Sequence, residues 1–153
     1  MTRIADERVR VAVPRARIWP VFDDADRLRQ ALPGCETLEA TGPGAFRGVL
    51  ATRLPFLTLR ADVTARLEDV AAPDSLRLEL DGRPRGLAGG FRASIPIALA
   101  EAGSATDVQY AVDLTTSGRL ATFGTPLLRD TFRKQVAALV ANLERMLAED
   151  VVA

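Results

Sequence analysis

The stretch from Pro126 to Glu149 constrains the fold most, because its apolar residues recur at three- and four-residue steps. This is the period of an α-helix with one apolar stripe. At about 1.5 Å per residue the helix would be roughly 36 Å long, enough to cross a small domain. Such a helix is stabilised mostly by what it packs against, so the other residues must supply an apolar surface. Its apolar residues are Leu127, Leu128, Phe132, Val136, Leu139, Val140, Leu143, Met146 and Leu147.

Seven other stretches alternate apolar with polar residues, and this period of two predicts strands that are buried on one face. The clearest is Thr58–Asp69, where apolar residues at odd positions face arginine, acid and threonine at even ones. A polar outer face is typical of an antiparallel sheet with one wetted side. The predicted strands are Glu7–Val13, Thr37–Thr41, Ala45–Leu54, Thr58–Asp69, Ser75–Asp81, Phe91–Leu99 and Thr106–Thr116.

Two short helices are predicted between the first and second strands. Pro14 suits the first turn of a helix, and Pro20 follows closely enough to shorten or kink it. A second helix is expected from Ala25 to Leu32 and ends at Pro33-Gly34. The expected order is therefore one strand, two short helices, six strands and a long helix. We find no repeat or linker, and expect a single domain over residues 1–153.

Composition excludes several classes of protein. Twenty basic side chains match twenty acidic ones, and the scattered arginines do not form a nucleic-acid footprint. An apolar share of 48% argues against disorder. No apolar run approaches the roughly 18 to 20 residues of a membrane span, and the N-terminus lacks the apolar core of a signal peptide. One cysteine leaves no intramolecular disulfide, so the cytoplasm is the expected location, including the inner face of the membrane.

The repertoire for catalysis and metal binding is small. The chain has no histidine, which excludes an imidazole base and a histidine-ligated metal. The lone Cys35 excludes a cysteine-built zinc or iron–sulfur site within one chain. We therefore expect no metal, no cofactor and no catalytic residue. Among groups able to transfer a proton, Tyr110 is the one that the strand pattern places on the inward face.

Two segments resemble a known family. Val11–Glu39 reads VAVPRARIWPVFDDADRLRQALPGCETLE, with a strand, a proline-opened helix containing a tryptophan, and the motif Leu32-Pro33-Gly34-Cys35-Glu36. Tyr110–Leu143 has an acid-bearing strand, a glycine, the pattern L-A-x-x-G and an amphipathic helix. In these features, and in the glycine-rich Gly86–Phe91, the sequence resembles the carbon monoxide dehydrogenase G-subunit (CoxG-type) family over nearly its whole length.

The resemblance implies an α+β, START-like (SRPBCC) helix-grip fold. In this fold a curved, seven-stranded antiparallel sheet wraps a long C-terminal helix around a hydrophobic cavity. Members are usually encoded near molybdenum-containing hydroxylases, and are credited with carrying a quinone-like molecule or with recruiting or maturing the enzyme at the membrane. Some members continue into a tail proposed to anchor in the membrane. Because this sequence stops at Ala153, we do not expect a direct anchor.

Three functions follow as hypotheses. The first is a non-enzymatic carrier of a quinone- or lipid-like molecule, linked to a molybdenum hydroxylase or carbon monoxide dehydrogenase system. The second is a maturation or membrane-recruitment factor that uses an exposed apolar patch or the arginines Arg83, Arg85 and Arg119. The third is a cyclase- or hydratase-type enzyme, which the superfamily also contains and which would need Tyr110. A peripheral membrane contact is compatible with the first two, and ligand, partner enzyme and oligomeric state stay open.

The inward side chains would line a ligand cavity or fill a core. Small inward residues, Gly48, Ala61, Ala65 and Ala93, and only eight aromatic side chains favour a cavity. Ligand pockets carry a few polar groups on an apolar wall, and the inward polar candidates are Thr52 and Tyr110. A buried Tyr110 hydroxyl would need a partner from protein or ligand. The predicted cavity residues are Leu50, Thr52, Leu54, Leu59, Leu78, Phe91, Ile95, Tyr110, Val112, Phe123, Leu127 and Phe132.

Four further features have a functional and a structural interpretation. Cys35 is a reactive thiol or, as we expect, a packed residue, since no basic residue lies within four positions. Gly86–Gly90 lacks the lysine and hydroxyl of a phosphate loop and is expected to be a hairpin or bulge. The acids of 23–26 would bind a cation or, as we expect, cap helices. Leu120 and Phe123, just before the long helix, form a movable flap or an ordinary helix start.

Overall fold

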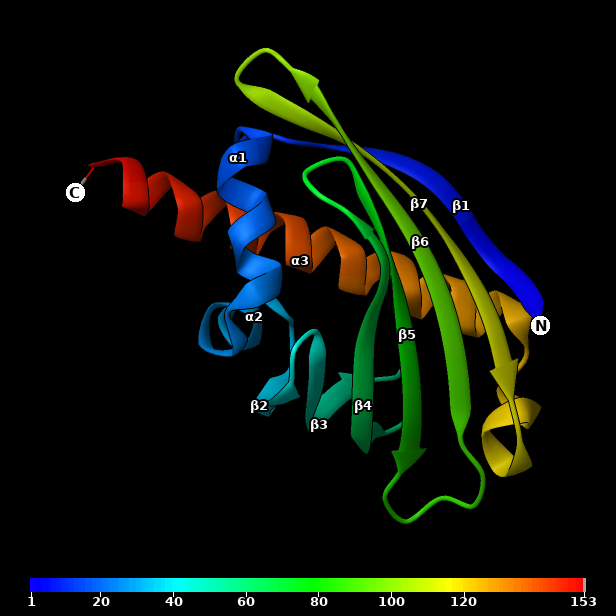
Figure 1. Cartoon of the computed structure of the whole chain (residues 1–153). Coiled ribbons are helices and arrows are strands. Elements are labelled where there is room, and N and C mark those ends of the chain that lie inside the picture. Colours follow the sequence, from blue (N-terminus) through cyan, green and yellow to red (C-terminus); the bar gives the residue numbers. More distant parts are fainter. Residues whose placement is uncertain (153) are drawn as a thin grey trace.

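A computed structural model describes residues 1–152, with side chains described up to residue 148. Its seven-stranded antiparallel sheet has the order β1-β7-β6-β5-β4-β3-β2, and the long helix α3 crosses one face (Figure 1). The predicted fold class and element order are confirmed. The elements are β1 (Thr2–Val11), α1 (Arg15–Ile18), the 3-10 helix η1 (Trp19–Asp23), α2 (Ala25–Ala31), β2 (Cys35–Gly42), β3 (Ala45–Arg53), β4 (Thr58–Ala71), β5 (Ser75–Pro84), β6 (Phe91–Ala102), β7 (Ala105–Thr116), the 3-10 helix η2 (Gly118–Phe123) and α3 (Thr125–Val152).

Strand β1 begins five residues before its predicted start. Its first residues pair with β7, where Thr2 lies opposite Leu114, and the register shifts between Arg3 and Ala5. This bulge hides the alternation, because one extra residue reverses the face on which the following side chains lie. The β1 strand also stops at Val11, two residues before its predicted end. The predictions for β5 and β6 are too short at their C-terminal ends.

The elbow between β1 and β2 caps one end of the sheet. Helix α1 passes into η1, where Pro20 occupies the start of the 3-10 turn, as a proline without an N–H donor allows. The Asp24 side chain caps α2 by accepting from the backbone N–H groups of Asp26 and Arg27 at 3.0 and 3.2 Å. The capping interpretation is therefore confirmed for Asp24. A buried cluster joins this elbow to β1, β6 and the second half of α3: Val11, Val13, Ile18, Val21, Ala31, Leu99, Leu143 and Leu147.

Helix α3 begins at Thr125, directly after Gly124, whose φ of 84° suits a residue without a Cβ. It packs against β1, α1 and α2. The Arg129 side chain donates to the carbonyl of Ile4 at 2.8 Å, and the Ala12 N–H donates to the Glu144 carboxylate at 2.8 Å. These polar contacts to β1 and to the residue that follows it hold the helix along the β1 edge of the sheet.

A second buried cluster lies under the first half of α3. Phe132 and Val136 of the helix pack against it from above. Together the two clusters fill the space at the elbow and beside the β1–β7–β6 part of the sheet. The members of the second cluster are Ile4, Ala5, Ala93, Ile95, Tyr110 and Val112.

The outer face of the sheet, away from α3, carries ion pairs that join different strands. Bidentate examples join Arg3 to Asp113 and Arg60 to Glu36, with N–O distances between 2.6 and 3.1 Å. This is the wetted side that the alternation predicts. No helix in the part of the chain that the structure describes is long and apolar enough to cross a membrane.

Candidate functional site

Strand register places the predicted cavity residues of the sheet on the face toward α3, here called the inner face. Thr52 lies opposite Leu59, and Leu78 lies opposite Ile95. Successive strands continue the same face through cross-strand pairs, since side chains opposite each other share a side. The inner-face residues that the sequence predicts on the strands are Leu50, Thr52, Leu59, Leu78, Phe91, Ile95, Tyr110 and Val112.

Small residues share this face, as predicted. Ala61 lies opposite Leu50, Ala65 opposite Leu80, and Gly48 opposite Val63. The Phe91 ring lies against Gly82 of the neighbouring strand, where a Cβ would come within 2.1 Å of a ring carbon. A glycine is therefore required for Phe91 to lie flat on the sheet.

The twelve predicted cavity residues fall into two groups by exposure. Leu54, Ile95, Tyr110 and Val112 are buried, with at most 6% of their surface exposed. The other eight are half-buried: Leu50, Thr52, Leu59, Leu78, Phe91, Phe123, Leu127 and Phe132.

Helix α3 shows the same contrast along its sheet-facing side. Helical periodicity places Leu128, Phe132, Gln135 and Leu139 opposite its exposed residues. All four are nevertheless only half-buried, whereas Leu147 near the elbow is 1% exposed. Side chains that face one another across the middle of the sheet and α3 therefore remain partly accessible to solvent.

The Tyr110 hydroxyl has a protein partner. It donates to the Glu7 carboxylate at 3.1 Å, and the same carboxylate accepts from Arg133 of α3 at 2.6 and 2.7 Å. Burial, with the adjacent Glu7 carboxylate as a second cause, raises the pKa of Tyr110 to about 12. The phenol therefore stays protonated at neutral pH and ties β7 to β1, while Arg133 ties α3 to the same carboxylate.

The sequence reasoning missed Glu7, Arg133 and Gln135. Glu7 lies two residues before Val9 and four before Val11, so the alternation along the strand itself indicates that Glu7 lies on the inner face. Helical periodicity likewise places Gln135 beside Phe132. Thr52 and Gln135 are half-buried, and neither side chain has a hydrogen-bond partner among the described residues. They are two polar groups available to a ligand on this face.

Phe123 lies just before α3 and contacts the loop between β3 and β4. Its ring meets Phe56 of the β3–β4 loop edge-to-face, with centroids 5.4 Å apart. The preceding 3-10 helix η2 is anchored by Leu120, which is 4% exposed. The start of η2 is also joined to the β5–β6 connection, because Arg119 N–H donates to the carbonyl of Ala88 at 2.9 Å. Residues 86–90 form this packed connection between strands, and Gly89 and Gly118 allow the two backbones to meet.

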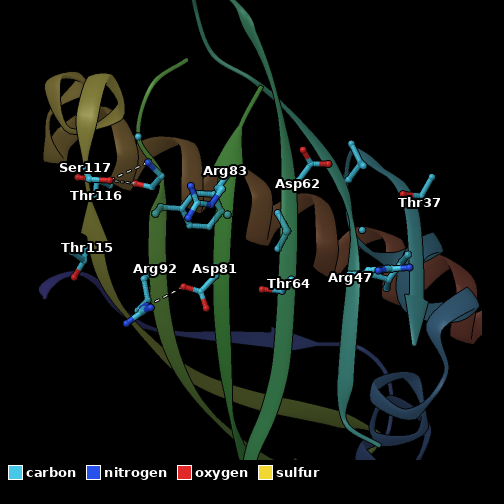
Figure 2. Close-up of a pocket in the computed structure, with 18 of the residues that line it drawn as sticks. Thr37, Arg47, Asp62, Thr64, Asp81, Arg83, Arg92, Thr115, Thr116 and Ser117 are labelled. Atoms are coloured by element: carbon cyan, nitrogen blue, oxygen red, sulfur yellow. Dashed lines mark hydrogen bonds and ion pairs between the residues drawn. The ribbon is translucent and has the colours of Figure 1, made fainter. Parts of the chain in front are cut away.

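A groove of about 1450 Å³ lies on the outer face of the sheet (Figure 2). Its labelled side chains stand in front of the strands, with α3 behind them, and are charged or hydroxyl-bearing. Most charged ones are already paired, as Arg92 is with Asp81 at 2.9 Å. A second groove, of about 480 Å³, also follows outer-face residues of β5, β6 and β7. Of the predicted cavity residues, only Phe91 borders the first groove and only Tyr110 the second.

The remaining candidates are the Cys35 thiol and groups of acidic side chains. The Cys35 thiol donates to the carbonyl of Thr37 at 3.3 Å, and burial raises its pKa, so a reactive thiolate is disfavoured. Among the described residues, no group of three or more acidic or cysteine side chains could hold a metal ion.

The sequence profile of CoxG, the carbon monoxide dehydrogenase G subunit, matches residues 8–148. The chain belongs to the CoxG family. The predicted resemblance is therefore confirmed over nearly the whole sequence. No curated protein matches the chain by sequence.

Solved structures share the fold of this CoxG family member at low sequence identity. A conserved protein from Geobacillus kaustophilus matches with a TM-score of 0.84 and 17% identity, covering 93% of each chain. A START superfamily protein from Mycobacterium smegmatis matches with a TM-score of 0.70 and 12% identity, covering 97% of this chain and 99% of the other. The likeness establishes a START-like fold and nothing further.

Proposed function

We propose that the protein is a non-enzymatic carrier that binds an apolar small molecule of the quinone or lipid class between the sheet and α3. The observation that carries the proposal is the set of apolar side chains on the inner face and on α3 that stay half-buried beside two buried clusters. Burying such surface against a ligand is favourable, at about 25 cal/mol per Å² of apolar area.

Two polar side chains would orient the ligand. Thr52 and Gln135 offer a hydroxyl and an amide without partners among the described residues. Both donate and accept hydrogen bonds, so they suit a carbonyl or hydroxyl head group on an otherwise apolar molecule. The family membership supports a link to a molybdenum-containing hydroxylase or carbon monoxide dehydrogenase, which would exchange electrons with such a ligand.

Native mass spectrometry of the purified protein, followed by solvent extraction, tests the proposal first. We expect a co-purifying quinone or lipid near one molecule per chain. A ligand-free mass that is unchanged after incubation with membrane extract would count against a carrier, and would favour the maturation or recruitment function.

Adjacent substitutions on β3 locate the site. Leu50 lies on the inner face and Val49 on the outer face, where it borders the outer groove. We expect Leu50→Trp to weaken binding of a tail-less naphthoquinone, measured by calorimetry, by roughly tenfold or more, since each 1.4 kcal/mol is a factor of about ten. Val49→Trp is the matched control and should bind normally. The opposite pattern would place the ligand in the outer groove and refute the proposed site.

A further inference from the structure

One end of the molecule is basic although the chain as a whole has no net charge. The end is formed by residues 53–60, 83–92 and 115–126, which we call the basic end. These three segments contain six arginines and no aspartate or glutamate. The rest of the chain holds the other 14 basic side chains and all 20 acidic ones. Charge is therefore segregated along the sheet.

The three segments meet in space. Arg53 at the end of β3 lies opposite Thr58, and the Arg85 N–H donates to the carbonyl of Arg60 at 2.7 Å. The β5–β6 connection in turn contacts the start of η2 through Ala88 and Arg119. Figure 1 shows the β5–β6 connection and η2 at the same end of the strands, while the β4–β5 and β6–β7 turns lie at the opposite end.

Each segment of the basic end contributes one arginine without a partner. Arg53, Arg83 and Arg119 are exposed, and none of their guanidinium groups pairs with another described residue. Arg83 stands in the middle of the view in Figure 2. The other three arginines of these segments are paired with acids: Arg60 with Glu36, Arg85 with Asp62 and Arg92 with Asp81. Three positive charges are thus left for an outside partner.

The same end exposes large apolar side chains. Phe56 is 60% exposed and Leu57 is 37% exposed, and both lie in the loop that directly follows Arg53. An apolar tip flanked by arginines is the pattern of a segment that inserts its apolar side chains at the headgroup level of a bilayer while its cations meet anionic headgroups.

We propose that the basic end docks on an anionic lipid bilayer, with Phe56 and Leu57 at its apolar tip. Docking would serve the proposed carrier, because an apolar ligand is stored in a membrane and Phe123, which contacts Phe56 of the tip, lies just before α3. The docking surface itself stands on charge and exposure and not on the identity of the ligand.

Co-sedimentation of the full chain with vesicles tests the proposal. We expect binding to vesicles of one part phosphatidylglycerol to two parts phosphatidylcholine, and little binding to phosphatidylcholine alone. Binding should fall sharply between 0.1 M and 1 M salt, where the screening length shrinks from about 10 Å to about 3 Å. Absence of binding to the anionic vesicles, or equal salt-independent binding to both kinds, would overturn the proposal.

Two triple variants with the same change in net charge distinguish the effect of these three arginines on vesicle binding from the effect of total charge. One basic residue at an anionic surface changes affinity roughly fivefold, so Arg53→Gln, Arg83→Gln and Arg119→Gln combined should weaken vesicle binding by roughly a hundredfold. The control combines Arg8→Gln, Lys134→Gln and Arg145→Gln, three exposed side chains elsewhere on β1 and α3, and removes the same total charge. Equal losses in the two triple variants would show that the basic end has no special part and would overturn the proposal.

A second pair of variants tests the apolar tip. Phe56→Asn combined with Leu57→Asn should weaken vesicle binding, whereas Val70→Asn should not, because Val70 is 54% exposed but lies at the opposite end of β4. An unchanged affinity in the tip variant would refute insertion of these side chains.

The docking proposal and the carrier proposal can be refuted independently of each other. The triple variant at Arg53, Arg83 and Arg119 should bind naphthoquinone in solution with the affinity of the original protein. This binding also shows that the variant folds. A protein that binds vesicles but no naphthoquinone would remove the carrier proposal and leave docking intact. The reverse result would remove docking alone.

Discussion

Leucine-to-alanine substitutions on α3 distinguish an open ligand space from a filled core. Leu147 is 1% exposed and belongs to the cluster at the elbow. Leu128 lies on the sheet-facing side of the same helix and is half-buried. Both substitutions remove the same atoms from the same type of backbone, so the change in helix propensity is equal. A difference in stability therefore reports the packing around each side chain.

The expected magnitudes differ severalfold. Leu147→Ala should cost about 3–5 kcal/mol, because a buried leucine loses its transfer free energy and leaves a cavity. Leu128→Ala should cost about 1 kcal/mol, because its partial burial is lost but no new cavity is formed. For a chain of this length, 1 kcal/mol corresponds to about 2–4 °C in Tm. We therefore expect Tm to fall by roughly 10 °C or more for Leu147→Ala and by about 3 °C for Leu128→Ala.

Circular dichroism during thermal and urea unfolding provides the measurement. The comparison is valid where the urea m-value is unchanged, since a changed m-value indicates an altered denatured or native state. A loss at Leu128 as large as the loss at Leu147 would mean that the middle of the sheet–helix interface is tightly packed. In that case the half-buried residues line no ligand space, and the reasoning behind the proposed function is refuted.

Two further predictions concern groups on the inner face. Thr106 is 0% exposed, and its hydroxyl donates to the backbone carbonyl of Val13 at 2.7 Å. Thr106→Val should therefore lower the free energy of unfolding, measured by urea titration, by about 1–3 kcal/mol. Thr64→Val, at an exposed position, is the control and should change the free energy of unfolding by less than about 0.5 kcal/mol. Because the chain has one tyrosine, phenolate absorbance reports Tyr110 alone, and its titration midpoint should lie at about 12 in the native protein and about 10 in denaturant. Since the folded pKa is the higher one, this contribution to stability is complete below about pH 10 and is lost as pH rises toward about 12; a native midpoint near 10 would contradict the buried hydrogen bond to Glu7.

The sequence predicts the elements well where one period runs without interruption. The alternation of Thr58–Asp69 and the apolar stripe of 126–149 both extend over many residues, and β4 and α3 contain them in full. The pattern fails at the start of β1, where the bulge between Arg3 and Ala5 shifts the register. It also underestimates β5, which runs on to Pro84 because its pairing with β4 continues there. The end of a strand depends on how far its neighbouring strand pairs with it, and a local sequence pattern does not contain this information.

The inner face is predicted more completely than its polar contacts. The alternation of side chains along the strand places Tyr110 on that face, but the hydrogen-bond partner of Tyr110 depends on which strand lies next to β7. Glu7 is 103 residues away in the sequence, and Arg133 reaches the same carboxylate from 126 residues away. Only the tertiary arrangement brings these three groups together. Whether the inner face holds a filled core or a ligand likewise depends on the spacing between helix and sheet, which side-chain pattern alone does not give.

The partners of the inner-face groups favour binding over turnover. A general acid or base must be free to exchange a proton with its substrate and have a pKa near the working pH. Glu7 is the acceptor for Tyr110 and Arg133, and burial raises the pKa of Tyr110 to about 12. Proton exchange by either group would disrupt contacts that join β1, β7 and α3. Thr52 and Gln135 keep free polar groups, but a hydroxyl and an amide orient a ligand by hydrogen bonding and do not titrate near neutral pH. Orientation of a ligand without proton transfer is what the proposed carrier function requires.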